Sequence, residues 1–179
     1  GAPVGSTRIR LIPPTEPETK RWRLDSRLNW KRDGRVLDIR QKTDFSAENL
    51  RPISLQRQLS VEALAGALTD QVTAADFREE DVRIVVRDPR SGNQVDRVIP
   101  LKKQFVLLGN QSFEHWLLIG KKIAQSKEVT FSALIPGEYR FLELKLLRER
   151  QEKIGEIPVH RWKVQSKDFE ALLWVGTNG

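Results

Sequence analysis

Two stretches near the start of the chain alternate large apolar residues with charged ones, and the dipeptide Asp33-Gly34 separates them. A period of two places successive side chains on opposite faces of a strand. Asp-Gly suits the tight turns that join antiparallel strands, because both of its residues tolerate a positive φ. The sequence therefore predicts a β-hairpin over residues 21–45 with one apolar face and one cationic face.

The first strand of this hairpin separates the two kinds of side chain cleanly. Its apolar face carries two tryptophans and two leucines, which are Trp22, Leu24, Leu28 and Trp30. Its other face carries the cations Arg21, Arg23, Arg27 and Lys31. The hairpin thus offers two surfaces with different binding chemistry, and the sequence favours a binding or carrier domain.

Turn-forming residues and the alternation of apolar with polar residues extend the β-pattern over most of the remaining chain. Residues 1–19 contain four prolines and show no periodicity, so they are interpreted as an arm or linker. Residues 20–179 are expected to form a single domain of about nine strands, with residues 61–77 left open between a short helix and a long hairpin tip. Ser112 is a candidate N-cap, and apolar residues at helical spacing follow it, which predicts one helix over residues 112–124. The expected fold is mainly β: a strongly curved antiparallel sheet, or half-barrel, with this helix over its concave face.

Several kinds of chemistry lack their usual residues. The chain has no cysteine, and its two histidines, His115 and His160, are at unrelated positions. No H-E-x-x-H pair, nucleophile elbow, P-loop or G-x-G-x-x-G fingerprint occurs in the sequence. We therefore expect a protein that is not an enzyme, with no metal site, no catalytic residues and no cofactor.

Charge and the N-terminus bear on partners and location. The formal net charge is +7 and the isoelectric point is about 9.9, which favours anionic partners such as nucleic acid, phospholipid headgroups or acidic glycans. The chain contains no methionine and starts Gly1-Ala2-Pro3-Val4. A removed signal peptide, initiator-methionine removal and a tag remnant all fit this start, and export to the periplasm is the preferred interpretation.

The order of motifs resembles that of an exported bacterial family of unknown function with a lipoprotein-carrier-like, lipoprotein-localisation-type β half-barrel. The resemblance covers most of residues 20–175 and rests on Leu50-Arg51-Pro52, the helix around Phe113 to Ile119, the run from Ile157 to Val164, and Leu172-Leu173-Trp174-Val175. It implies a role in envelope assembly or in binding a hydrophobic ligand. It supplies no catalytic residues.

The leading hypothesis is an exported protein that binds a lipidic or otherwise apolar ligand under the helix. The expected ligand-lining residues are Trp22, Leu28, Trp30, Ile39, Phe45, Phe113, Trp116 and Trp162. The residues expected to contact an anionic surface from outside are Arg21, Arg23, Arg27, Arg40 and Lys42. Core packing is the competing interpretation of the tryptophans. A protein-interaction module of an envelope complex is the main alternative function, and nucleic-acid binding is disfavoured because no aromatic residue lies among the cations.

Overall fold

The structure is a computed structural model that describes residues 4–14, 20–63, 66–109, 114–124 and 126–176. It divides into two compact units, Gly1–Leu101 and Lys102–Gly179. Each unit has a sheet of its own, with seven strands in the first and five in the second. The sequence suggests one domain over residues 20–179, whereas the chain divides into these two compact units.

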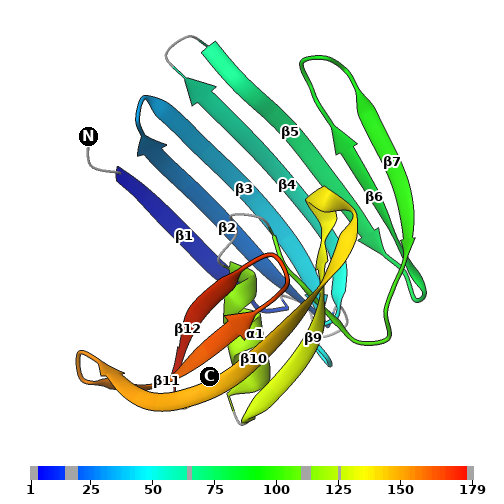
Figure 1. Cartoon of the computed structure of the whole chain (residues 1–179). Coiled ribbons are helices and arrows are strands. Elements are labelled where there is room, and N and C mark those ends of the chain that lie inside the picture. The colour runs from blue at the N-terminus through cyan, green and yellow to red at the C-terminus, as the bar shows by residue number, and fades with distance from the viewer. Residues whose placement is uncertain (1–3, 15–19, 64–65, 110–113, 125, 177–179) are drawn as a thin grey trace. The chain divides into compact units, whose positions relative to one another are not determined.

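The first unit is an antiparallel meander in which every strand pairs with its neighbours in chain order, as Figure 1 shows. Its strands are β1 (Val4–Ile12), β2 (Arg21–Arg32), β3 (Arg35–Ser46), β4 (Pro52–Ala63), β5 (Gly66–Phe77), β6 (Asp81–Arg87) and β7 (Gln94–Pro100). Short connections suffice because antiparallel neighbours need only a turn between them. The unit is thus a continuous sheet without a helix among its described residues.

The opening hairpin forms as the sequence predicts. The turn residues Asp33 and Gly34 have φ values of 49° and 72°, the positive range that this dipeptide accommodates. Trp22 lies opposite Phe45, and Leu28 lies opposite Ile39. Because directly opposed residues share a face, the apolar residues of both strands are on one side of the sheet.

Two segments differ from expectation. Val4–Ile12 is strand β1 and pairs along its whole length with β2, so the expected arm over residues 1–19 is wrong for this part. The alternation of Ile9 and Leu11 with Arg8 and Arg10 carries a strand signal that the neighbouring prolines obscured. Gly66–Phe77, which the sequence left open, is strand β5.

The second unit combines a five-stranded sheet with the one helix of the described chain. Its elements are β8 (Phe105–Leu107), α1 (Glu114–Ile123), β9 (Glu128–Ile135), the 3-10 turn η1 (Pro136–Glu138), β10 (Arg140–Ile154), β11 (Ile157–Gln165) and β12 (Glu170–Gly176). Only the β8–β9 pair is parallel among the pairings of this sheet. The helix is confirmed, although Ser112 and Phe113 lie outside the described residues.

The helix packs against the sheet of its own unit. Ile119 and Ile123 are at most 1% exposed and belong to one buried cluster with Leu144, Trp162 and Val164. Leu117, on the opposite side of the helix, is 56% exposed. This one-sided burial is what stabilises a short amphipathic helix, which is marginal in isolation.

The mainly β class with one helix and a large antiparallel sheet is confirmed, and the sheet is not closed. The described residues form twelve strands in two sheets, where the sequence suggested about nine strands in one. Within these residues no helix has the length and apolar character needed to cross a bilayer.

Candidate functional site: a basic hollow on strands β1 to β3

Strand register aligns arginines across three neighbouring strands. Arg8 on β1 lies opposite Arg27 on β2, which lies opposite Arg40 on β3. One step along the sheet, Asp25 lies between Arg10 and Lys42. Directly opposed like charges destabilise a sheet. The row Arg8–Arg27–Arg40 therefore lowers the stability of the sheet, and the needs of the fold do not explain it.

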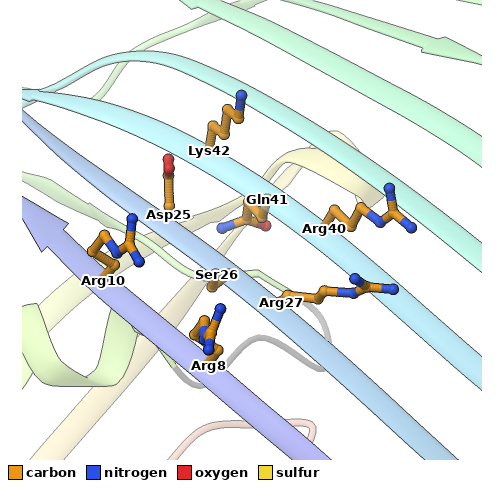
Figure 2. Close-up of a pocket in the computed structure, with 8 residues that line it drawn as sticks. All are labelled: Arg8, Arg10, Asp25, Ser26, Arg27, Arg40, Gln41 and Lys42. Atoms are coloured by element: carbon orange, nitrogen blue, oxygen red, sulfur yellow. The ribbon is translucent and has the colours of Figure 1, made fainter.

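These side chains surround an open hollow of about 270 Å³, which we call the basic hollow. Figure 2 shows its lining, with Arg8 and Arg10 from β1, Asp25, Ser26 and Arg27 from β2, and Arg40, Gln41 and Lys42 from β3. The side chains of Ser26 and Gln41 alternate to the other face of the sheet, so these residues contribute their backbone to the floor. The accessible side chains are five cations and one carboxylate.

Asp38 neutralises part of this charge from the edge of the hollow. Its Oδ2 lies 3.1 Å from Nη2 of Arg27 and 3.2 Å from Nη2 of Arg40. Arg8, Arg10 and Lys42 form no ion pair with any residue that the structure describes. Within the described part of the chain, three cations of the basic hollow therefore have no counter-charge at contact distance.

Other arginines of the same sheet are differently arranged. Nε of Arg23 lies 2.8 Å from Oδ1 of Asp44, which lies directly opposite on β3. This hydrogen bond from Arg23 lowers the pKa of Asp44, and burial opposes it. Arg83 on β6 also pairs with an aspartate across strands, although its partner Asp96 lies two residues along β7 from the directly opposed Val98. Cross-strand pairing of opposite charges is thus normal in this sheet, and the basic hollow departs from it.

The structure brings together three of the five residues expected to contact an anionic surface. Arg27, Arg40 and Lys42 line the basic hollow, whereas Arg21 and Arg23 lie farther along the same face. Arg8 and Arg10 were missed because residues 1–19 were interpreted as an arm. Their alternation with Ile9 and Leu11 was the available signal.

The expected apolar lining is divided between the two units. Five of its members share one face of the β2–β3 hairpin, and these are Trp22, Leu28, Trp30, Ile39 and Phe45. Ile39 and Phe45 are each 2% exposed, whereas Trp22, Leu28 and Trp30 are only partly buried. The lining of one apolar ligand by all eight residues stays a prediction.

The remaining members belong to the second unit or lie outside the described residues. Trp162 is completely buried in the core of the second unit, and Trp116 packs against that core. Phe113 falls outside the described residues. Trp162 thus packs as the core interpretation expects, on a strand that lies between β10 and β12.

A polar row also crosses the apolar face of the first sheet. Gln41, Arg57 and Thr73 occupy opposed positions on β3, β4 and β5, and each is at most 8% exposed. Nε2 of Gln41 donates a hydrogen bond of 3.4 Å to Oγ1 of Thr43. The alternation in β2 does not reveal this row, because β2 contributes only Ser26 to it.

The two histidines are in different settings. Nδ1 of His115, at the start of α1, accepts a hydrogen bond of 2.9 Å from the backbone N–H of Gly109. His160 lies on β11, opposite Gln151. Among the described residues no group of three or more His, Cys, Asp or Glu is placed to hold a metal ion.

Fold and site together define a β-sheet protein with an open cationic hollow on a sheet face. Neither a protein-family model nor a curated protein sequence matches the chain. Among solved structures, it is similar to a β-barrel-like protein of a domain of unknown function, DUF1849, from Brucella abortus. The TM-score is 0.60 at 13% sequence identity, over 99% of this chain and 79% of that one. At this identity the likeness shows the fold alone, and that fold is β-barrel-like.

Proposed function

We propose that this chain is a non-enzymatic binding protein of the bacterial cell envelope, which attaches to anionic phospholipid headgroups through the basic face of β1 to β3. One observation carries the proposal: five cationic side chains from three strands surround one open hollow. Location in the periplasm is part of the proposal.

The charge of the site sets the expected strength of attachment. Five cations with Asp25 and Asp38 leave a net charge of +3. A basic residue near an anionic membrane surface contributes about 1 kcal/mol. The face therefore supplies about 3 kcal/mol, or roughly a hundredfold preference for anionic over neutral membranes at low salt.

Co-sedimentation with vesicles tests this function. The protein is expected to sediment with phosphatidylglycerol-containing vesicles, to remain in solution with pure phosphatidylcholine vesicles, and to be released as salt rises. Equal binding to both vesicle types would overturn the proposal. Binding to a single-stranded oligonucleotide but to neither vesicle would also overturn it, in favour of a nucleic-acid function.

A second candidate function is the binding of a lipidic or apolar ligand on the opposite face of β2 and β3. The observation that favours it is the partial exposure of Trp22, Leu28 and Trp30 on an otherwise buried face. An acyl chain gains about 0.8 kcal/mol per buried CH₂ group, so a short chain would bind measurably. A protein-interaction module with a fully packed core is the alternative.

Tryptophan fluorescence distinguishes these alternatives. A fatty acid is expected to shift the emission of the native protein, and Trp30→Phe should reduce the shift. Trp174→Phe is the matched control, because Trp174 is 42% exposed on β12 of the other unit. No shift in the native protein would exclude the apolar ligand and favour the interaction module.

A further inference from the structure

We propose that the basic hollow is a discrete binding site for a phosphate monoester group, and that Arg8 and Arg10 of β1 make it selective over a phosphodiester. This inference deepens the proposed function, on which it rests for the identity of the partner as a membrane headgroup. It goes further because attachment by diffuse charge needs neither a hollow nor particular arginines.

The first argument is the placement of like charges. Arg8, Arg27 and Arg40 are directly opposed on adjacent strands, which weakens the sheet in the absence of an anion. Of the carboxylates that the structure describes, only Asp38 compensates within contact distance, and it contacts two of the three arginines. A bound anion with two negative charges would remove this repulsion, so ligand binding and sheet stability should be coupled.

The second argument is the shape and composition of the site. A hollow of about 270 Å³ accommodates a phosphate group together with part of the group it esterifies. Four of its five cations are arginines, whose planar guanidinium groups donate paired hydrogen bonds to phosphate oxygens. A monoester presents three terminal oxygens and up to two charges, whereas a diester presents two oxygens and one charge. The site therefore favours the monoester.

The third argument is which cations are available. Arg27 and Arg40 are engaged with Asp38, whereas Arg8 and Arg10 form no ion pair with the described residues. A ligand can recruit Arg8 and Arg10 without breaking an ion pair among the described residues. These two side chains, on the edge strand β1, are expected to contribute most to phosphate affinity.

Asp25 limits what the hollow accepts. It lines the hollow between Arg10 and Lys42, where its negative charge reduces the affinity for any anion. Asp25→Asn removes that charge at nearly constant volume. We expect this variant to bind inorganic phosphate about two- to fivefold more tightly, because one nearby unit charge in water changes a binding free energy by this order.

Paired variants test whether the site is discrete. Arg8→Ala with Arg10→Ala removes two charges from the hollow, and Lys31→Ala with Arg35→Ala removes two charges from the nearby hairpin end, outside the lining. Inorganic phosphate, titrated calorimetrically into each protein in chloride buffer, is the first probe. Affinity is expected to fall about tenfold or more for the hollow variant and less than twofold for the control.

Vesicles are the second probe and identify the source of the phosphate. The native protein is expected to bind phosphatidic acid vesicles more tightly than phosphatidylglycerol vesicles matched for surface charge. Arg8→Lys with Arg10→Lys should remove this preference while keeping binding to both, because lysine keeps the charge but not the paired hydrogen bonds.

Each outcome bears on one proposal. Equal losses in the hollow and control variants would overturn the discrete site and leave attachment by diffuse charge intact. Binding of inorganic phosphate without binding to any vesicle would support the site and overturn the membrane as its partner. No preference for phosphatidic acid in the native protein would overturn the selectivity for a monoester.

Discussion

Asp38 is the residue at which fold stability and anion binding are expected to oppose each other. Its carboxylate receives hydrogen bonds from Arg27 at 3.2 and 3.1 Å and from Arg40 at 3.2 Å. The side chain of Asp38 is 23% exposed, while those of the two arginines are 55% and 59% exposed. Asp38→Asn therefore removes two solvent-screened ion pairs at nearly constant shape.

The magnitude follows from these contacts. Exposed ion pairs contribute about 0.2–1 kcal/mol each, and the repulsion between the opposed Arg27 and Arg40 then acts without compensation. We expect Asp38→Asn to lower the free energy of unfolding by about 1–2 kcal/mol at low salt. For a chain of 179 residues that unfolds in one transition, 1 kcal/mol corresponds to roughly 2–4 °C in the melting temperature.

Anion affinity should move in the opposite direction. Removing one negative charge at the edge of the basic hollow changes the binding free energy of an anion by about 0.5 kcal/mol in water, on the order of a two- to threefold gain for a monoanion. Inorganic phosphate should consequently restore part of the lost thermal stability. Thermal melting in chloride and in phosphate, together with calorimetric titration of phosphate, measures both effects.

Asp44→Asn is the matched control. Asp44 also pairs with an arginine across β2 and β3, but it does not line the basic hollow. Its variant should lose comparable stability and keep the native affinity for phosphate. If Asp38→Asn binds phosphate less tightly than the native protein, or if Asp44→Asn gains as much affinity, the argument from local charge is wrong.

Three further predictions concern the fold. Leu144→Ala should lower the free energy of unfolding in urea by about 2–5 kcal/mol, because this side chain is completely buried. Leu117→Ala, at a 56% exposed position, should change that free energy by no more than about 0.5 kcal/mol. Similar losses of stability in the two variants would refute the assignment of Leu144 to the core. Gly34→Ala should lower the melting temperature by an amount corresponding to about 1 kcal/mol, since φ is 72° there, and an unchanged melting temperature would contradict this backbone constraint. The hydrogen bond from Arg23 lowers the pKa of Asp44 in the folded state. The stabilisation from this pair is therefore fully present above about pH 4, the unfolded pKa of the carboxyl group, and is lost as pH falls through the lower folded pKa. The difference in melting temperature between the native protein and Asp44→Asn should shrink in acid, and a difference that grows in acid would contradict the pairing.

The β1 segment shows why local patterns were not enough for the site. The alternation at Arg8, Ile9, Arg10 and Leu11 is a short strand signal, and the prolines that follow it favoured an arm. A segment of this length becomes a strand when a neighbouring strand offers a full set of hydrogen-bond partners, as β2 does along all of β1. A short stretch of sequence around β1 does not show that β2 will pair with it.

The sequence alone determined the hairpin and its two faces, because side-chain alternation and the Asp33-Gly34 turn are local properties of the backbone. It also determined the helix, whose apolar residues recur at helical spacing. Only the tertiary structure decided that the strands form two sheets and that Trp162 is a core residue. Only register across three strands placed Arg8 beside Arg27 and Arg40, because the pairing of distant segments depends on hydrogen bonds that no single stretch of sequence contains.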